Sequence, residues 1–344
     1  MSHITYLEAA VVGLIQGVSE LFPVSSLGHN VLIPALVGGS WAQDLNVSSA
    51  SSSYLAFIVG MHVATAIALL IYFWRDWIRI IGGFLSSIRD RRVETRDQRM
   101  AWMIILATIP VGLVGVVADK PFREIFGKPV VAGVFLIING VILYCGEKFR
   151  PRRSVRADQQ IAAERQRERE LVAAGPGGYG PPAARQPGQP RQARHAAGQQ
   201  AARQEEAMLA IQADERLSRM GYLQAVIIGA SQILALLAGI SRDGVTMVTG
   251  MARGLSREDA ARFAFLLATP VILAAGVLEL PKLTGPLGHG IHGQILLGSV
   301  LSGVGAYLSV RFLMRYFQTR TLTPFAIYCF VFGLASVIYL GFIK

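Results

Sequence analysis

Six apolar runs, each long enough to cross the hydrocarbon core of a bilayer, restrict this chain to a membrane-embedded fold. They lie at residues 54–74, 101–118, 130–146, 261–280, 294–314 and 324–343. The composition agrees, because 52% of the residues are hydrophobic, only 16% are charged, and the mean hydropathy is +0.44. Since a bilayer offers no hydrogen bonds to the backbone, helices are the expected elements. The sequence therefore predicts an all-α polytopic membrane protein.

Two further apolar segments, at residues 4–38 and 221–255, are each interrupted near the middle by a Pro or a Gly beside polar residues. A helix broken in this way is typical of a re-entrant hairpin. The sequence thus predicts six transmembrane helices plus two re-entrant helical hairpins.

The two hairpin segments are related to each other in sequence. A shift of 216 residues without a gap superposes Tyr6 on Tyr222, Leu7 on Leu223, Ala9 on Ala225, Gly13 on Gly229, Gln16 on Gln232, Ser25 on Ser241 and Gly28 on Gly244. We therefore expect two related halves, each contributing one polar hairpin to a single site.

Basic residues predict the orientation of the two halves. Clusters at Arg75–Arg99, Lys148–Arg156 and Arg311–Arg320 fall on one common side of the six spans. Because loops rich in Lys and Arg stay in the cytoplasm, both termini are expected outside. The first half, 1–149, then starts outside and the second half, 218–344, starts inside, which is an inverted repeat.

Residues 150–217 differ from both halves, since Arg, Gln, Ala, Gly and Pro dominate and large apolar side chains are scarce. Such a segment cannot bury enough surface to fold alone, so a disordered basic cytoplasmic linker is expected, with surface helices near 159–173 and 201–219. The formal net charge of +11 reflects these cytoplasmic segments and favours anionic lipid headgroups. No nucleic-acid partner is expected, because aromatic residues are not interleaved with the basic ones.

The first hairpin carries polar residues at helical spacing. Gln16 and Glu20 are four residues apart and share one face of a helix, which Pro23 then ends. Beyond the break, Ser25 or Ser26 can cap a second short helix, whose unpaired N–H groups and positive dipole end face the same point as Glu20. An anion bound there is well placed.

Two residues in the next turn extend this site. Gly28 allows close approach of the backbone, and His29 lies within one turn of Ser25 and Ser26. This spacing is near enough for proton transfer between the histidine and a serine hydroxyl.

The second hairpin supplies complementary groups. Gly239 breaks the helix, Ser241 stands in a capping position, and Arg242 offers a planar fork of donors that suits phosphate. Asp243 and Thr246 lie one turn inside. Two half-helices whose N-termini meet near mid-membrane, with an arginine between them, predict an electropositive pocket that fits a phosphate or diphosphate better than a cation.

Charged groups are expensive in a bilayer, which favours functional roles for Glu20, His29 and Arg242. The capping serines and Thr246 are different, because small hydroxyl residues are also common where membrane helices pack closely. Both interpretations stay open for them.

Two polar residues stand alone within predicted spans. His62 and Asn139 have no polar neighbour in the sequence, so packing or an interhelical hydrogen bond is the expected role for each.

The two motifs together resemble those of the bacterial undecaprenyl-pyrophosphate phosphatases, the bacitracin-resistance type of membrane lipid phosphatase. The pattern is Q-x-x-x-E-x-x-P-x-S-S-x-G-H, followed much later by G-x-S-R-x-G-x-T. Further stretches similar in order and spacing are FIVGMHVATAIALLIYFWRDW at 57–77, GLSREDAARFAFLLATPVILAAG at 254–276 and TPFAIYCF at 323–330. The resemblance covers most of the chain outside the linker.

The resemblance implies an enzyme of the bacterial cell membrane that removes the terminal phosphate from the C55 isoprenyl diphosphate carrier. The product is the lipid monophosphate that serves peptidoglycan synthesis. An active site opening to the outer face is also implied, and a homodimer is left open.

Carried over residue by residue, the family's motifs fall on Gln16, Glu20, Ser25, Ser26 and His29 in the first half and on Ser241, Arg242 and Thr246 in the second. Two positions depart from the family's usual pattern, because Ala238 and Asp243 stand where a Pro and a Ser are usual. A carboxylate next to Arg242 lowers the positive charge of the pocket unless it binds a metal ion or pairs with that arginine.

The expected substrate contacts come from both hairpins. Besides Arg242, the residues expected to bind the diphosphate are Gln16, Ser25, Gly28, Ser241, Asp243, Gly244 and Thr246.

The expected chemistry is metal-assisted phosphoryl transfer. Glu20 and Gln16 are the expected anchors of a divalent cation, Mg²⁺ or Ca²⁺. Ser26 is the candidate nucleophile, and His29 its base or the proton donor to the leaving oxygen. Attack by water through the same histidine is left open.

A transporter is the alternative, because inverted repeats with helices broken at mid-membrane are also typical of secondary transporters. The alternative is a lipid-phosphate flippase or an anion transporter. The Ser-Ser-x-Gly-His sequence favours the enzyme, since a transporter needs no nucleophile and base within one turn.

Overall fold

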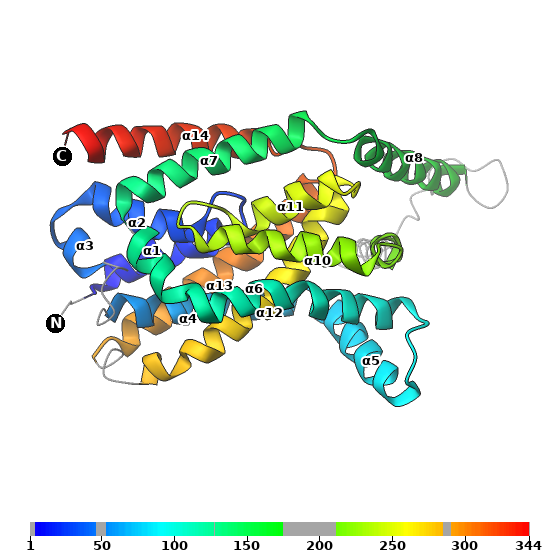
Figure 1. Cartoon of the computed structure of the whole chain (residues 1–344), viewed down its shortest axis with the longest axis horizontal. Coiled ribbons are helices and arrows are strands. Elements are labelled where there is room, and N and C mark those ends of the chain that lie inside the picture. The colour runs from blue at the N-terminus through cyan, green and yellow to red at the C-terminus, as the bar shows by residue number, and fades with distance from the viewer. Residues whose placement is uncertain (1–3, 46–52, 127, 175–210, 285–289, 344) are drawn as a thin grey trace, which may run out of the picture.

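The computed structural model describes residues 4–45, 53–126, 128–174, 211–284 and 290–343, and all regular elements in these ranges are helices (Figure 1). The first half contains α1 (Tyr6–Ser19), α2 (Ser26–Val37), α3 (Gly39–Asp44), α4 (Ser53–Tyr72), α5 (Trp74–Asp90), α6 (Arg96–Phe126) and α7 (Pro129–Lys148). After α8 (Arg152–Ala174) and a short helix at Ile211–Ser218, the second half contains α10 (Tyr222–Ala230), the 3₁₀ helix η1 (Ser231–Leu236), α11 (Arg242–Ala252), α12 (Arg257–Thr284), α13 (His292–Tyr316), α14 (Thr323–Ile338) and the π-helical turn η3 (Tyr339–Ile343).

Five helices in the described residues are long and apolar enough to cross a membrane, or up to seven spans if each of two bent pairs counts as one. The five are α6, α7, α12, α13 and α14 with η3, and each contains one of the predicted runs. The run predicted at 54–74 is α4, which continues into α5 after a bend of 85°. The chain is therefore a multi-pass, all-helical membrane protein.

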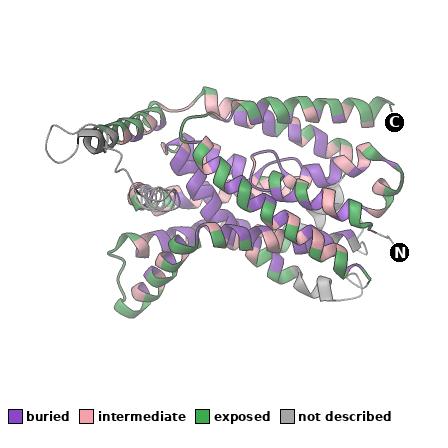
Figure 2. Ribbon diagram, turned by 180° about the vertical axis from the view of Figure 1, so that it is seen from behind, coloured by how far each residue is buried: buried purple, intermediate pink, exposed green. Residues whose placement is uncertain are grey.

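Residues 75–99, which were expected to form a basic loop, are largely helical, because α5 extends to Asp90 and α6 begins at Arg96. Helix α5 buries Asp76, Gly83 and Ser87 and has exposed residues on its other face (Figure 2). The exposed face carries large apolar side chains, among them Ile78, Ile81 and Leu85. The sequence analysis missed this helix because its apolar residues are mixed with charges and do not form a continuous run.

Helix α12 forms the centre of the bundle, since 61% of its apolar window is buried against 33% or less for the other four spans. It packs against α4, and α7 packs against α14. Phe263 and Phe265 of α12 are fully buried and belong to the main apolar core. This core surrounds the two segments that were predicted as hairpins.

Each hairpin crosses a long helix of the other half at a glycine. Helix α1 packs on α13, where a Cβ atom on Gly13 would lie 2.6 Å from the carbonyl oxygen of Gly298. Helix α10 packs on α6, where a Cβ on Gly229 would lie 2.0 Å from the carbonyl oxygen of Ala107. The 216-residue shift pairs these two glycines, and they share one function, which is to let two backbones approach closely.

The two halves enter the bundle from opposite ends. Helix α1 begins at the end where α14 finishes, whereas α10 begins at the other end, near α8 and the turn between α5 and α6 (Figure 1). The three basic clusters lie toward this second end, because they belong to α5, to the start of α8 and to the end of α13.

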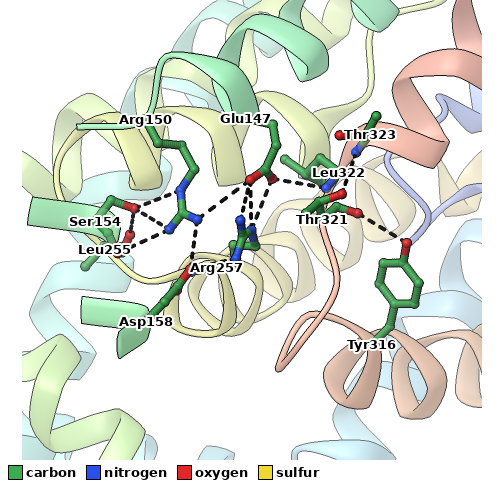
Figure 3. Close-up of polar contacts among 10 residues, drawn as sticks. All are labelled: Glu147, Arg150, Ser154, Asp158, Leu255, Arg257, Tyr316, Thr321, Leu322 and Thr323. Carbon is green, nitrogen blue, oxygen red and sulfur yellow. Dashed lines mark hydrogen bonds and ion pairs between the residues drawn. The ribbon is translucent and has the colours of Figure 1, made fainter. Parts of the chain in front are cut away.

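Helix α8 is held on the bundle by the network of polar contacts shown in Figure 3. Glu147, at the end of α7, accepts hydrogen bonds from Arg257 at 2.5 Å and from the backbone N–H of Leu322 at 3.1 Å. Asp158 of α8 pairs with Arg150 at 2.8 Å and with Arg257 at 2.7 Å. One acidic residue from α7 and one from α8 thus join α8, α12 and the start of α14.

Both ends of the segment predicted as a disordered linker contact the first turns of α12. Arg165 of α8 pairs with Glu258 at 2.6 Å, and Asp214 of the 211–218 helix pairs with Arg262 at 2.9 Å. These two helices fall where surface helices were expected at the ends of the linker, near 159–173 and 201–219. Long-range ion pairs stabilise them, although they are too polar to fold alone. The rest of that segment, 175–210, lies outside the described residues.

The crossing at Gly229 provides a test of the fold. Gly229→Ala should lower the melting temperature of the detergent-purified protein, because the new methyl group collides with a backbone carbonyl, and overpacking of this kind costs about 1–3 kcal/mol. Gly115→Ala, in α6, is the control, since a Cβ there meets nothing within 4 Å. Equal melting temperatures for the two variants, read by size-exclusion chromatography after heating, would contradict the packing described.

Candidate active site

The breaks of the two hairpins, at residues 20–25 and 237–241, meet inside the bundle. A Cβ atom on Gly28 would lie 2.9 Å from the Cα of Gly239, and Gly239 has a φ of +112°, so both positions require glycine. The Ser25 hydroxyl joins the two breaks, because its Oγ accepts hydrogen bonds from the N–H groups of Gly28 and Gly239, each at 3.2 Å. Ser25 itself has a φ of +68°, a strained conformation for a non-glycine residue.

The two serines paired by the 216-residue shift cap equivalent helices. Ser25 is the N-cap of α2, and Ser241 is the N-cap of α11, where its Oγ accepts from the N–H of Gly244 at 3.1 Å. This follows from the spacing, since a capping side chain reaches an N–H three residues later. Thr246 instead donates to the carbonyl oxygen of Arg242 in its own helix at 2.7 Å.

Asn139, in the middle of α7, satisfies one backbone group in each break. Its Nδ2 donates to the carbonyl oxygen of Pro23 at 3.0 Å, and its Oδ1 accepts from the N–H of Ser241 at 3.0 Å. A third contact joins Nδ2 to the sulfur of Cys329 at 3.3 Å. The expected interhelical hydrogen bond of this residue is confirmed, and it connects both hairpins to one scaffold helix.

Glu20 is the centre of the polar site and is buried. It accepts hydrogen bonds from the Ser26 hydroxyl and from Nη2 of Arg242, and from Nε2 of Gln16 at 2.8 Å. Ser26 and Arg242 are partly exposed, so the site is accessible on their side. The structure thus places the acidic, hydroxyl and basic residues of the two motifs in direct contact.

The Gln16 amide has a defined orientation. Its Oε1 accepts from Asn30 at 2.5 Å, so its Nε2 faces Glu20 and also lies 3.3 Å from Nε2 of His62. The amide therefore presents hydrogens, and not its oxygen, to the centre of the site.

His62 belongs to the site although the sequence analysis placed it outside. Its Nδ1 donates to the carbonyl oxygen of Ile58 at 2.9 Å, so Nε2 carries the lone pair when the ring is neutral. This Nε2 lies 3.5 Å from Oε2 of Glu20. The stretch at 57–77 that resembles the phosphatases contains His62 and was the available signal.

His29 is directed away from the Glu20 carboxylate. Its Nδ1 donates to the carbonyl oxygen of Ser25 at 2.7 Å, and its Nε2 lies 2.8 Å from the hydroxyl of Tyr328. The ring stacks against Tyr328 and Phe332 of α14, with centroid separations of 5.7 and 5.2 Å. Both nitrogens are therefore occupied by partners other than Ser26, whose hydroxyl bonds to Glu20.

Asp243 is buried beside the same centre with an incomplete set of partners. Neither of its carboxylate oxygens has a hydrogen-bond partner among the described residues, and Oδ1 lies 3.9 Å from Nε of Arg242, which is also unpartnered there. Arg242 thus faces two carboxylates, from Asp243 and Glu20, and its single positive charge cannot neutralise both.

These features define a class of protein: a multi-pass membrane protein in which two broken helices bring a carboxylate, a hydroxyl and a guanidinium together at one buried centre. The chain belongs to the family described as bacitracin resistance protein BacA, whose sequence profile matches residues 9–171 and 197–335. This membership agrees with the resemblance found in the two motifs.

Relatives of known name extend over the whole chain. The chain is 55% identical to an undecaprenyl-diphosphatase of Mycolicibacterium paratuberculosis over 340 residues, which cover 99% of each protein. It is 51% identical to undecaprenyl-diphosphatase 2 of Frankia alni, with 97% of each covered, and 38% identical to an undecaprenyl-diphosphatase of Acidiphilium cryptum, with 98% of this chain and 99% of the relative covered.

Replacing Asn139 tests the role of α7. Asn139→Leu should lower the melting temperature and the activity together. It leaves the buried N–H of Ser241 unpaired, at about 1–3 kcal/mol, and leaves the carbonyl oxygen of Pro23 with only the weak thiol donor of Cys329 at 3.8 Å. Ser336→Ala is the control, since this buried hydroxyl donates within its own helix, to the carbonyl oxygen of Phe332 at 2.7 Å. An unchanged melting temperature in Asn139→Leu would contradict the bridging role.

Proposed function

We propose that this chain hydrolyses undecaprenyl diphosphate to undecaprenyl phosphate and inorganic phosphate, and so recycles the lipid carrier of peptidoglycan synthesis. The observation that carries the proposal is the contact of Glu20 with both Ser26 and Arg242, which puts a hydroxyl nucleophile, its proton acceptor and a phosphate-binding arginine within one site. The names of relatives that match the full chain support the same substrate.

The diphosphate is bound where the N-termini of α2 and α11 meet. Ser25 and Ser241 already satisfy the N–H groups of Gly28 and Gly244, which leaves the earlier N–H groups of each first turn available to phosphate oxygens. Arg242 supplies the charged donors and exchanges part of its contact with Glu20 for the substrate. The phosphate oxygens of the substrate thus compete with the Glu20 carboxylate for the guanidinium of Arg242.

The reaction begins with attack by the Ser26 hydroxyl on the terminal phosphorus. The new bond joins Oγ to phosphorus, the bond to the bridging oxygen breaks, and the proton of the hydroxyl passes to Glu20. Undecaprenyl phosphate leaves, and water then cleaves the phosphoserine to regenerate Ser26 and release inorganic phosphate. Direct attack by water is the alternative route, and Ser26 then only positions the substrate.

The two histidines have separate roles in this proposal. Nε2 of His62 lies 3.3 Å from the Gln16 amide nitrogen and 3.5 Å from Glu20, and its lone pair would accept a proton from the attacking water. His29, first expected as the base, joins the start of α2 to Tyr328 and thereby positions Ser26. The reason for the reassignment is geometric, because the hydroxyl of Ser26 bonds to Glu20.

We also propose a divalent cation, Mg²⁺ or Ca²⁺, as cofactor. Gln16 and Glu20 were the expected ligands, but the Gln16 oxygen is bonded to Asn30, whereas the two unpartnered oxygens of Asp243 suit a cation. Glu20 and Asp243 would hold the ion together with phosphate oxygens, an arrangement usual for Mg²⁺. No group of three His, Cys, Asp or Glu side chains lies close enough to hold a metal ion in the described part of the chain, so the phosphate oxygens would have to complete the coordination. When bound, the cation stabilises the negative charge of the diphosphate.

The finer topology is part of the proposal. Six transmembrane helices and two re-entrant hairpins would form an inverted repeat, with the basic ends of α5 and α13 in the cytoplasm and the start of α1 outside. The opposite entry of α1 and α10 supports it, as does the gathering of basic ends on one side (Figure 1). The site would open to the outer face of the bacterial cell membrane, as in the phosphatases that the motifs resemble.

The function is tested by release of inorganic phosphate from a C55 isoprenyl diphosphate by the detergent-purified protein. Arg242→Ala, Glu20→Gln and Ser26→Ala should each lower kcat by at least about a hundredfold, since each removes a group that acts on the transferring phosphoryl. His62→Ala should lower kcat more than His29→Ala does. Arg253→Ala, an exposed arginine at the end of α11, is the control and should retain activity. A folded wild-type protein without phosphate release would favour a transporter instead.

The cation is tested without turnover, by electron paramagnetic resonance of Mn²⁺ added to the purified protein with a non-hydrolysable diphosphate. Asp243→Asn keeps the shape and removes the charge, and it should weaken Mn²⁺ binding at least about tenfold, the equivalent of about 1.4 kcal/mol. Unchanged Mn²⁺ affinity in this variant would remove Asp243 from the cation site and leave the phosphatase assignment intact.

A further inference from the structure

A hollow of about 450 Å³ at the C-terminal end of α13 is distinct from the candidate active site. Its lining consists of Leu308, Arg311, Phe312, Arg315, Tyr316, Thr319 and Arg320. Three arginines in one hollow of this size form a site of concentrated positive charge. Nothing in the proposed chemistry uses them.

Two of the three arginines lack the carboxylate partners that other arginines at the same end have in the described part of the chain. Most neighbouring arginines that dock helices are paired with acidic residues, as are Arg165 with Glu258 and Arg257 with Glu147. By contrast, Arg311 and Arg320 form no ion pair with any residue in the described ranges. The hollow therefore keeps a positive field that an external anion can neutralise.

The turn that carries Arg320 is held in place. Figure 3 shows the Tyr316 hydroxyl donating to the carbonyl oxygen of Thr321 at 3.2 Å and the Leu322 N–H donating to Glu147 at 3.1 Å. Glu147 is meanwhile bonded to Arg257, so it does not act as the partner of Arg320. Arg320 thus projects from a fixed turn beside the last turn of α13, and less ordering is needed when a ligand binds.

An exposed apolar stripe leads along α13 to the hollow. Leu296, Val300, Val304 and Leu308 follow one another at intervals of four residues, and each is more than half exposed. The stripe ends at Phe312, whose ring stacks on Phe22 of the first hairpin at 5.9 Å. One face of α13 is therefore apolar over four turns and basic in the last. Such a face is complementary to a lipid that has an apolar acyl chain and an anionic headgroup.

We propose that the hollow binds the phosphate headgroup of an anionic phospholipid, with an acyl chain along the Leu296–Leu308 stripe. Arg311 and Arg320 contact the phosphate oxygens, while Arg315 and Thr319 complete the rim. The lipid comes from the leaflet on the side of the basic clusters, because the hollow lies at the end of the α13 span. A free phosphate has no use for the apolar stripe, so the lipid is the better match.

The contact between Phe312 and Phe22 gives this lipid a route to the active site. Phe22 lies in the break of the first hairpin, two residues after Glu20. A bound acyl chain that presses on Phe312 restricts the movement of that break. We therefore expect the lipid to stabilise the first hairpin. Loss of the lipid should destabilise the break at residues 20–25 before it destabilises the rest of the bundle.

Native mass spectrometry of the full chain in detergent tests the proposal, with phosphatidylglycerol and phosphatidylcholine offered separately. The wild type should retain one phosphatidylglycerol and little phosphatidylcholine. Each arginine removed should weaken retention about fivefold, since a basic residue near an anionic lipid contributes about that factor. The test variants are Arg311→Gln, Arg320→Gln and the triple variant R311Q/R315Q/R320Q, and Arg253→Gln is the matched exposed control.

Three outcomes decide the question. Equal retention of phosphatidylglycerol by Arg311→Gln, Arg320→Gln and the control would overturn the proposal, and so would equal retention of the two lipids by the wild type. If inorganic phosphate displaces the lipid completely, the site binds free anions and the lipid assignment fails. The single variants keep the test decisive if the triple variant does not fold, and their melting temperatures and size-exclusion profiles report on folding.

Discussion

The buried contact between Glu20 and Arg242 is the interaction on which the rest of the structure depends. It joins the hairpin of one half to the hairpin of the other, in a place where an unpaired charge costs several kcal/mol. Removal of either charged residue would therefore leave the other as an unpaired charge inside the bundle. The same carboxylate also accepts the hydrogen bond of Ser26, and this is the contact on which the proposed reaction is based.

The backbone imposes a second requirement, since a helix broken among apolar neighbours leaves N–H and carbonyl groups without partners. Ser25, Ser241 and Asn139 satisfy these groups with their side chains. Their hydrogen bonds explain why these polar residues are needed whatever the reaction is. They also explain the precision of the site, because α7 fixes both breaks relative to each other and so places Ser26 next to Glu20.

Pairing distinguishes the many arginines at the basic end of the molecule. Arg165 and Arg257 are neutralised by carboxylates and serve to dock α8 on the bundle. Arg311 and Arg320 have no such partner in the described ranges and remain available to an anion from outside. Both the paired and the unpaired arginines contribute to the net charge of +11. Their different roles follow from their positions in the structure and not from the total charge.

Hydropathy alone determined where the long helices lie, because a long apolar run needs a bilayer whatever its neighbours are. Spacing alone predicted a cap at Ser241 and another at Ser25 or Ser26, because a cap reaches only three residues along its own chain, and the structure identifies Ser25 as the second cap. Only the tertiary structure places His62, Asn139 and Asp243 beside the two breaks. Asn139 is 116 residues from Pro23 and 102 from Ser241, the two residues that it joins. Sequence spacing reports which residues share a turn of one helix, whereas these contacts form between helices whose packing no local pattern records.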